Sequence, residues 1–536
     1  YEVIANGKLV SVKKDAKNTK DAMDAKTWHY DMEHPMSSYL LAFAIGEYGK
    51  QELVSNSGIP MANYYYPEDS LRVEPTYRYT QRIFDFLEDE IGVAYPWQNY
   101  KQVPVHDFLY AGMENTGTTI FSDGYVIDST AFVDKNYVNV NAHELAHQWF
   151  GNLVTEQNGN HHWLHEGFAT YYAYLAEKEL FGEDHLYWKL YASSMQLSEM
   201  AKKGEGESLL DPKASSLTFY EKGAWALFML REHIGDTAFR KGIRQYLKKY
   251  AFKNVTVSDF LAEMESTFGS DLSNFKKEWL ETTAFPQDEA LNALSKHSPS
   301  LRLNFEMEAD VENAKDGAID YAKYWNASSS IYLKKHILTT YRNTLPEEII
   351  ERAFASDTVP IRQALSTAVD IKKYDKKSFE SLLGDESYVT IENALFILWE
   401  SYPEDRKSYL DRTSDIIGLP NKNVRLLWLT LAMLTPDYQG KNTKVFFDEL
   451  DGYTGTSYAF EVRQSAFFYL KEAFGLTDQS LKNLILATDH HAWQFKKFAR
   501  NLLQEVIQDR DYKLRIEKVA KELNDEELRY LNSISQ

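Results

Sequence analysis

The stretch His143-Glu144-Leu145-Ala146-His147 decides how this chain is interpreted, together with Glu166, which follows nineteen residues after the second histidine. Residues four apart on a helix share one face, so His143 and His147 can point at the same place. Two neutral imidazoles and one carboxylate, with a fourth position left to water, are the ligands of a catalytic rather than a structural zinc site. The pattern predicts one Zn2+ per chain, bound by His143, His147 and Glu166. Glu144 is not needed as a ligand and can take the proton of the water.

The residues around these ligands predict two helices joined by a loop. Gln148–Val154 continues the first helix with bulky apolar side chains, until Gly151 loosens or ends it. Glu166 opens a run to Leu175 that is typical of a second helix. A chance H-E-x-x-H motif on a surface helix would leave this second element unexplained. The third ligand is therefore expected at the start of the second helix.

In the frames H-E-L-A-H-Q-W-F-G-N and W-L-x-E-G-F-A, this pattern resembles the gluzincin aminopeptidases of the aminopeptidase N (alanyl aminopeptidase) family, which includes a leukotriene-hydrolase branch. Upstream, Phe108–Asn115 resembles the family's G-A-M-E-N exopeptidase motif. Downstream, Phe219–Gly223 resembles the family's Y-x-K-G segment. The three landmarks follow the family's order, and the clear similarity covers about residues 30 to 285.

The resemblance implies a role for each landmark. Glu114 would bind the free α-ammonium of a peptide, so that only the first peptide bond reaches the metal. Tyr220 would act as a second catalytic residue by donating a hydrogen bond to the oxyanion that forms at the carbonyl. The small residues beside Glu114 would let the backbone approach the substrate closely. The expected substrate-binding residues are Ala111, Gly112, Met113, Glu114 and Asn115.

Two positions depart from the family pattern. The family usually has Gly-Ala before Met-Glu-Asn, whereas this chain has Ala111-Gly112, which keeps the room for substrate. The family usually has asparagine before the third ligand, whereas this chain has His165. His165 could compete as a ligand, but we expect it beside the ligands, because Glu166 keeps the family spacing. His161 and His162 are expected to be loop histidines with no metal role.

Composition indicates a large protein with a sizeable core and two to four domains, since 44% of its 536 residues are hydrophobic and 26% are charged. The formal net charge of −20 argues against nucleic acid and anionic membranes as partners, and suits a cavity that attracts the cationic amino end of a peptide. The absence of cysteine excludes disulfides and thiolate metal sites. No apolar run is long enough to span a membrane, and no secretory signal pattern opens the chain.

The amino-terminal part predicts β structure. Tyr1–Val10 carries an Asn-Gly turn between two strand-like runs, the pattern of a hairpin. Residues 1–50 resemble the last strands of the family's amino-terminal β domain, so the chain is expected to be an amino-terminally truncated or processed form. A signal or anchor could have been lost with the missing part, and the compartment is unknown.

The expected fold class is multidomain α+β, with the residual β segment followed by two further domains. Residues 51–286 are expected to form a thermolysin-like α/β zinc catalytic domain. Residues 287–345 are polar and poorly periodic, which predicts a linker or an irregular cap. Residues 346–536 predict an all-α, HEAT/armadillo-like solenoid, because apolar residues recur at three- and four-residue spacing between short turns. This domain would wall the active site or, alternatively, bind a protein partner. Its expected helices are 347–355, 361–369, 391–399, 424–434, 462–473, 493–507 and 512–523.

These features together predict a zinc-dependent aminopeptidase that hydrolyses the amino-terminal residue from peptides with a free amino terminus. One alternative is a thermolysin-like endopeptidase with the same zinc ligands, against which Glu114 argues. Another is a non-catalytic scaffold that binds proteins through its solenoid, against which the intact catalytic residues argue. The sequence leaves open an epoxide-hydrolase side activity, the preferred terminal residue, the natural substrate and the oligomeric state.

Overall fold

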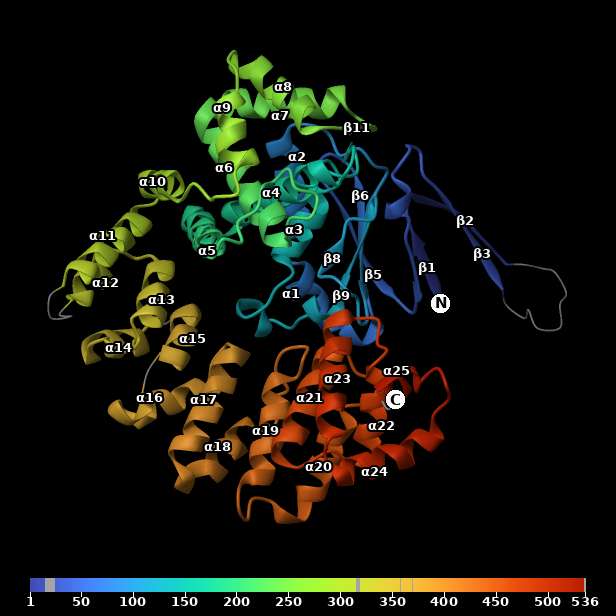
Figure 1. Ribbon diagram of the computed structural model, residues 1–536, viewed down its shortest axis with the longest axis vertical. Helices are drawn as coiled ribbons and strands as arrows, with labels where there is room; N and C mark the ends of the chain where they lie inside the picture. Colours follow the sequence, from blue (N-terminus) through green and yellow to red (C-terminus); the bar gives the residue numbers. More distant parts are fainter. Residues whose placement is uncertain (15–24, 315–318, 357, 369, 535–536) are drawn as a thin grey trace. The chain divides into compact units, whose positions relative to one another are not determined.

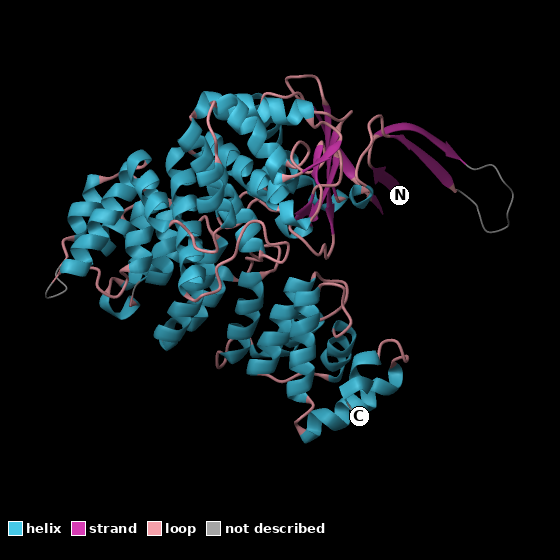
Figure 2. Ribbon diagram, turned by 45° about the horizontal axis from the view of Figure 1, so that its top comes forward, coloured by secondary structure: helices cyan, strands magenta, loops and turns pink. Residues whose placement is uncertain are grey.

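The computed structural model describes residues 1–14, 25–314, 319–356, 358–368 and 370–534 (Figure 1). Two compact units can be distinguished. Unit 1 comprises residues 1–105, 111–121 and 137–333, and unit 2 comprises residues 106–110, 122–136 and 334–536. Unit 1 contains strands and helices, whereas the carboxy-terminal part of unit 2 is built from helices (Figure 2). The expected multidomain α+β fold with a helical carboxy-terminal region is confirmed at this level.

The strands of unit 1 form one five-stranded sheet, in the order β5-β6-β7-β9-β8, and three two-stranded sheets. In the larger sheet β5 and β6 are antiparallel, β6 and β7 are parallel, and β8 and β9 are antiparallel. The strands are β1 (Glu2–Ala5), β2 (Lys8–Lys14), β3 (Lys26–Asp31), β4 (Phe43–Gly46), β5 (Gly49–Val54), β6 (Pro60–Tyr65), β7 (Tyr100–Val105), β8 (Gly112–Met113), β9 (Thr118–Ser122), β10 (Val154–Glu156) and β11 (Lys253–Val255).

The hairpin predicted at the start of the chain is wrong. Strand β1 pairs with β4 and strand β2 pairs with β3, so the Asn6-Gly7 turn joins two different sheets. The side chain of Asn6 explains the difference, because it is buried and bonded to distant segments. Its Nδ2 donates to Leu40 O at 3.1 Å and to Thr116 O at 2.8 Å, and its Oδ1 accepts from Ala42 N at 2.7 Å. Local turn chemistry was therefore overridden by long-range hydrogen bonds.

Helix α4 (Trp163–Phe181) is the central helix of unit 1, and residues 163–177 are all buried. A helix that is buried on every side belongs to a protein core. Its start passes very close to the segment at Gly223: a Cβ atom on Gly223 would lie 2.7 Å from Cα of Gly167. The other helices of this region are α1 (Val73–Tyr77), α2 (Thr80–Ile91), α3 (Val138–Ala146), α5 (Glu183–Lys202), α6 (Gly223–Ile234), α7 (Asp236–Lys249), α8 (Val257–Phe268) and α9 (Ser273–Phe275).

Residues 287–345, expected to be a linker or an irregular cap, contain helices α10 to α13. Helix α11 begins with a cap that the sequence analysis overlooked: the side chain of Ser298 accepts a hydrogen bond from Leu301 N. Residues 315–318 lie outside the described part. The helices are α10 (Gln287–His297), α11 (Pro299–Asn313), α12 (Tyr321–Ala327) and α13 (Ile331–Thr340).

Unit 2 has a helix at each of the seven predicted positions, although the predicted end of one helix at residue 369 lies outside the described residues. From Ile371 onward the helices share a core of buried aliphatic and aromatic side chains. Within the described residues of the whole chain, no helix combines the length and hydropathy needed to cross a bilayer. The seven helices are α14 (Glu347–Phe354), α15 (Val359–Ala368), α17 (Tyr388–Ser401), α19 (Asn423–Leu434), α21 (Phe460–Ala473), α23 (Trp493–Val506) and α24 (Arg510–Val519). Further helices are α16 (Lys376–Ser381), α18 (Arg406–Thr413), α20 (Thr443–Gly452), α22 (Asp478–Ala487) and α25 (Arg529–Ile534).

Candidate active site

Helix α3 carries His143 and Glu144 and ends at Ala146, so that His147 stands at its C-cap. The predicted continuation of this helix past the motif is not observed. The chain turns away at Gly151, whose φ of 130° is accessible to glycine but strained for other residues. The turn lets Nδ1 of His147 bond to Phe150 O at 2.9 Å. Because that nitrogen donates to a carbonyl, Nε2 is the nitrogen of His147 that carries the lone pair when the ring is neutral.

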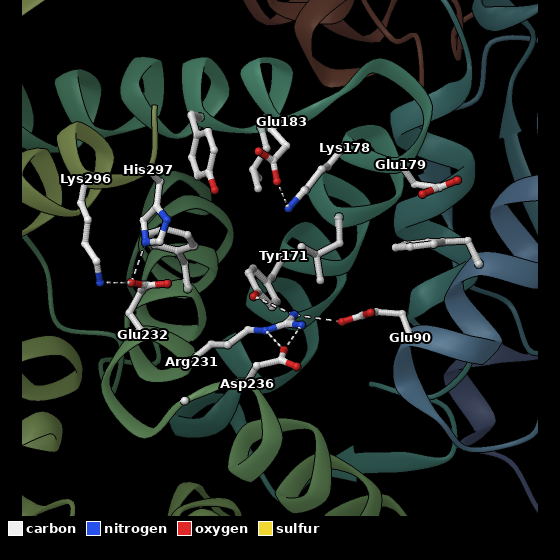
Figure 3. Close-up of a pocket in the computed structure, with 16 residues that line it drawn as sticks. Glu90, Tyr171, Lys178, Glu179, Glu183, Arg231, Glu232, Asp236, Lys296 and His297 are labelled. Carbon is white, nitrogen blue, oxygen red and sulfur yellow. Dashed lines mark hydrogen bonds and ion pairs between the residues drawn. The ribbon is translucent and has the colours of Figure 1, made fainter. Parts of the chain in front are cut away.

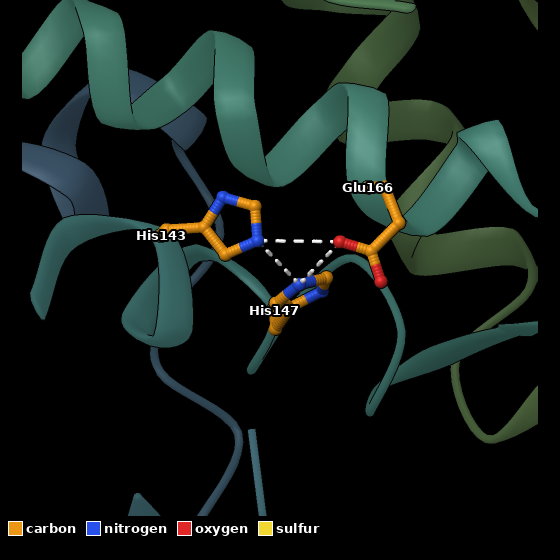
Figure 4. Close-up of side chains that lie close together, drawn as sticks. All are labelled: His143, His147 and Glu166. Carbon is orange, nitrogen blue, oxygen red and sulfur yellow. Dashed lines mark hydrogen bonds and ion pairs between the residues drawn. The ribbon is translucent and has the colours of Figure 1, made fainter. Parts of the chain in front are cut away.

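The side chains of His143, His147 and Glu166 converge on one point (Figure 4). Oε2 of Glu166 lies 3.3 Å from Nε2 of His143 and 3.4 Å from Nε2 of His147. The two Nε2 atoms lie 3.0 Å apart. Three side chains from two helices thus direct their donor atoms at a common centre.

This arrangement fits a zinc ion. Zinc–ligand distances of about 2.0–2.1 Å place neighbouring donors of a tetrahedron about 3.3–3.4 Å apart. The three observed separations, 3.0, 3.3 and 3.4 Å, are close to that value. The hydrogen bond from His147 to Phe150 O also supplies the orienting contact that metal-binding histidines usually make.

Charges within this cluster strongly perturb its ionisation. Burial lowers the pKa of His143. Burial also acts to lower the pKa of His147, but Glu166, Glu114 and Glu144 raise it to about 10. Burial disfavours the ionised form of Glu166, yet the neighbouring His147 and His143 hold its pKa well below the usual range. The carboxylate of Glu166 is therefore ionised and available to a cation.

Glu144 lies beside this centre and points toward the five-stranded sheet. Its carboxyl is buried, and burial raises its pKa well above the usual range. Donor atoms of Glu144, Glu114 and His147 lie within 4.8 Å of one another. A Cβ atom on Gly112 would lie 2.5 Å from Oε1 of Glu144, so the glycine leaves room for this carboxylate. Glu144 is thus adjacent to the converging donors without being one of the three.

Hydrogen bonds from distant residues position Glu114, and the sequence analysis missed them. Nε2 of Gln148 and Nδ2 of Asn152 donate to the backbone oxygen of Glu114, at 3.2 and 2.7 Å. The hydroxyl of Tyr39 donates to Oε1 of Glu114 at 3.4 Å. Gln148 and Asn152 follow the histidine motif directly, so their place in that motif was the available signal. Tyr39 lies 75 residues before Glu114, and nothing local in the sequence indicates the contact.

The rest of the predicted substrate segment surrounds Glu114. Gly112 and Met113 form strand β8 and are half-buried, whereas Ala111 is exposed. Asn115 is buried, and its Nδ2 donates to Leu40 O at 3.3 Å. The segment therefore forms a strand end whose acidic residue faces the converging donors.

Tyr220 lies on a single π-helical turn, η6 (Thr218–Lys222). Its ring stacks on the imidazole of His143, with ring centroids 5.4 Å apart and parallel planes. Burial and the neighbouring Glu166 raise the pKa of its hydroxyl, which therefore stays protonated and able to donate. Inserted π turns recur at functional sites because they redirect one side chain out of the helical register.

The three additional histidines lie at the start of α4. Nε2 of His165 accepts a hydrogen bond from Glu156 N at 2.7 Å. Nδ1 of His162 lies 3.2 Å from Oε2 of Glu156, and its Nε2 lies 3.7 Å from Oε1 of Glu166. Nδ1 of His161 accepts from Val257 N at 3.3 Å. His162 and His165 are thus neighbours of the Glu166 carboxylate, and His161 is bonded to another segment.

A separate cavity of about 660 Å³ lies farther along α4 and contains none of these residues in its lining (Figure 3). Its cations are paired: Arg231 with Glu90 at 2.9 Å and with Asp236, and Lys178 with Glu183 at 2.9 Å. His297 lies 2.7 Å from Glu232. Because these charges neutralise one another, the cavity is distinct in chemistry from the converging His–His–Glu centre.

Comparison with known proteins shows similarity in this region. Residues 76–279 match the peptidase family M1 domain. Over 274 residues the chain is 32% identical to glutamyl aminopeptidase from Bos taurus, covering 47% of this chain and 28% of the bovine protein. It is 33% identical over 277 residues to aminopeptidase N from Streptomyces lividans, covering 48% and 32%. The matched region therefore spans less than a third of either relative.

The fold also resembles solved structures of LTA4 hydrolase from yeast. The complex with bestatin is 18% identical, with a TM-score of 0.55, and the match covers 94% of this chain and 72% of the yeast chain. The native form is 19% identical, with a TM-score of 0.53 and coverage of 89% and 73%. At this level of identity the likeness establishes the fold alone.

Proposed function

Because residues 76–279 form a peptidase family M1 domain, we propose that this chain is a zinc-dependent aminopeptidase that removes single residues from the amino termini of peptides. The observation that carries the proposal is the convergence of His143, His147 and Glu166 beside a buried Glu144. The names of the curated relatives support the same activity.

His143, His147 and Glu166 would hold one Zn2+ per chain. When bound, zinc polarises the scissile carbonyl and makes an attacking water more acidic. The contact between His147 and Phe150 O fixes the ring so that Nε2 faces the centre. The ionised Glu166 completes a set of two imidazoles and one carboxylate, which leaves a position open for chemistry.

Glu144 would be the general base. Burial raises its pKa, so the carboxylate readily accepts a proton from the attacking water and can later give it to the leaving amine. A carboxylate with an ordinary, low pKa would be a weaker base near neutral pH. Its position next to the donor cluster, rather than in it, leaves both oxygens available for proton transfer.

Glu114 would bind the α-ammonium of the substrate and thereby select the terminal peptide bond. The Gln148 and Asn152 amides hold its backbone, and the Tyr39 hydroxyl meets one of its carboxylate oxygens. A carboxylate held in this way is ready to form a charge-assisted bond with an ammonium group without reorganising. We assign Tyr39, Gln148 and Asn152 as positioning residues for Glu114, and Ala111, Gly112, Met113 and Asn115 as its substrate-binding neighbours.

Tyr220 would donate a hydrogen bond to the oxyanion that develops when the carbonyl is attacked. Stacking on His143 keeps its ring close to the centre, and its raised pKa keeps the proton on the hydroxyl. A donor fixed in advance stabilises the developing charge more than mobile water does.

Neither alternative function accounts for both Glu114 and Glu144. An endopeptidase has no use for a buried carboxylate at the place of a terminal ammonium. A non-catalytic scaffold has no use for a buried base beside three converging donors. The contacts that hold Glu114 and the burial of Glu144 favour the exopeptidase.

We also propose a division of the chain by function. Residues 1–50 would be the end of an amino-terminal β domain, and residues 51–286 a thermolysin-like catalytic domain. Residues 287–345 would form a helical cap, and residues 346–536 a HEAT/armadillo-like solenoid. Successive helices joined by short turns, with one shared core from Ile371 onward, support the last assignment.

A metal-removal experiment tests the proposed activity. The purified chain is assayed with aminoacyl chromogenic substrates before and after treatment with a chelator, and bound zinc is counted. We expect about one tightly bound zinc per chain, loss of hydrolysis on chelation and recovery on adding zinc. Glu166→Ala should lose both the metal and the activity, whereas His29→Gln, on the exposed face of β3, should keep both. Full hydrolysis by metal-free protein would contradict the proposal.

A further inference from the structure

We infer that Glu156, His162 and His165 form a second binding site for a divalent cation of the zinc class, next to the candidate metal centre. One donor atom from each of these residues lies within 4.8 Å of the other two. The site goes beyond the proposed aminopeptidase function, which needs only His143, His147 and Glu166. It also revises the sequence-based expectation that His162 has no metal role.

The separation between His162 and Glu156 is that of two neighbouring ligands. Nδ1 of His162 lies 3.3 and 3.2 Å from Oε1 and Oε2 of Glu156, close to the separation of about 3.3–3.4 Å between donors on a tetrahedral zinc ion. Nε2 of His165 accepts a hydrogen bond from Glu156 N, so this ring is a neutral imidazole with a lone pair. Binding a cation through that nitrogen requires the ring to release the hydrogen bond from Glu156 N, whose amide keeps its proton.

The segments that carry these residues are held in place without a cation. Strand β10 pairs with β11 in parallel, and Nδ2 of Asn254 donates to Glu156 O at 3.0 Å. The turn before His162 is fixed by Nδ2 of Asn160, which donates to Leu210 O at 3.0 Å. The His162 ring also packs edge-on against Phe219, with ring centroids 5.0 Å apart. Because these segments are ordered before a cation binds, binding costs less conformational entropy.

The charge and exposure of the cluster suit a cation that arrives from solvent. Among the described residues, His162 is the one side chain that forms an ion pair with Glu156, so no lysine or arginine neutralises this carboxylate. The His162 side chain is 36% exposed, whereas His165 is buried. The cluster thus presents an accessible carboxylate and imidazole over a buried imidazole.

Glu166 connects the two sites. Its Oε2 faces His143 and His147, and its Oε1 lies 3.7 Å from Nε2 of His162.

Two imidazoles and a carboxylate prefer Zn2+ and similar transition metals to Mg2+ or Ca2+, which favour oxygen ligands alone. We therefore assign the second site to a transition-metal cation that binds more weakly than the first, because one of its ligands must first release a hydrogen bond.

Calorimetric titration of the chelator-stripped full chain with zinc chloride tests the inference, with bound zinc counted by atomic absorption and a parallel titration with magnesium chloride. We expect two zinc-binding phases, and no second phase with magnesium. His162→Gln and Glu156→Gln should each lower the zinc affinity of the second phase by about 10–100-fold and leave the first phase intact. His29→Gln, which removes an exposed histidine elsewhere, should keep both phases. Glu156→Gln preserves side-chain size, and thermal unfolding shows that each variant is folded.

Saturation of the parent chain at one zinc would overturn the inference and would mean that His162 is only an ion-pair partner of Glu156 and Glu166. A second phase that survives in both His162→Gln and Glu156→Gln would overturn it as well, because the second cation would then bind elsewhere. The readout is stoichiometry rather than hydrolysis, so failure of this inference leaves the proposed aminopeptidase activity untouched.

Discussion

The metal half of the candidate site is supplied by two helices, whereas the substrate half is supplied by a strand end and a 3-10 turn. His143 and Glu144 come from α3 and Glu166 from α4, so helical spacing determines where they lie. Glu114 follows strand β8 and meets Tyr39, which belongs to the turn Ser38–Leu40. The metal half is therefore set by two helices and their packing, and the substrate half by hydrogen bonds between distant segments. Changes in the first should abolish the chemical step, and changes in the second should alter how substrate is held.

The largest effect is expected from Glu144→Gln. Glutamine keeps the size of the side chain but cannot accept the proton, so kcat should fall by roughly 10²–10⁴-fold. Zinc content should not change, because Glu144 is not one of the three converging donors. The measurement is kcat together with zinc content, and full activity in this variant would show that the base lies elsewhere.

A somewhat smaller effect is expected from Tyr220→Phe. Removing the hydroxyl deletes a donor that acts only in the transition state, so kcat should fall by about 100-fold with KM near the parent value. The phenyl ring can still stack on His143, and zinc content should be unaltered. Unchanged kcat with intact zinc would exclude Tyr220 as the oxyanion donor, and parallel loss of zinc would indicate a structural role.

Gly223→Ala tests whether helix packing sets the geometry of the metal half. The new Cβ would lie 2.7 Å from the Gly167 backbone, which neither helix can avoid by moving a side chain. Overpacking of this kind costs about 1–3 kcal/mol of unfolding free energy. Because Gly167 follows Glu166 and Gly223 follows the turn of Tyr220, kcat should fall by about tenfold as well. Gly452→Ala, at an open position at the end of α20, is the control for glycine replacement on a helix, and equal kcat in both variants would argue against a positioning role.

The smallest effect is expected from Tyr39→Phe, in the substrate half. A long hydrogen bond to a carboxylate contributes about 0.5–1.5 kcal/mol, so KM for free-amine substrates should rise about two- to tenfold with little change in kcat. Tyr1→Phe, at the exposed start of the chain, is the matched control. A fall in kcat without a change in KM would move Tyr39 from substrate positioning to the chemical step.

Local sequence patterns predicted the helices of unit 2 and the pair of histidines at the candidate site. The seven expected helices of unit 2 begin and end within a few residues of those observed, because their apolar spacing repeats at helical period. The convergence of His143 and His147 followed from their spacing of four residues. The hairpin at Asn6 failed because that side chain bonds to Leu40 and Thr116, which no local pattern reveals.

Long-range contacts account for the remaining differences. The pairing of Tyr39 with Glu114 spans 75 residues, and the π turn at Tyr220 directly precedes Gly223, where the chain passes close to Gly167. The helices within residues 287–345 were overlooked because their apolar faces are narrow and interrupted by polar residues. The position of His162 between Glu156 and Glu166 depends on the path of the loop before α4. No residue spacing in that loop indicates its path.

The assignment as an exopeptidase depends on the substrate half of the site, and one comparison of substrates tests it directly. The measurement is kcat/KM for matched peptides with a free or an acetylated amino terminus, in the parent chain and in Glu114→Ala. The account predicts that acetylated peptides are poor substrates for both proteins. It also predicts that Glu114→Ala lowers kcat/KM for free-amine peptides, because a buried charge pair is lost. The corresponding loss of transition-state stabilisation is about 2–4 kcal/mol. Rapid cleavage of acetylated peptides by the parent chain would contradict the aminopeptidase assignment and favour an endopeptidase.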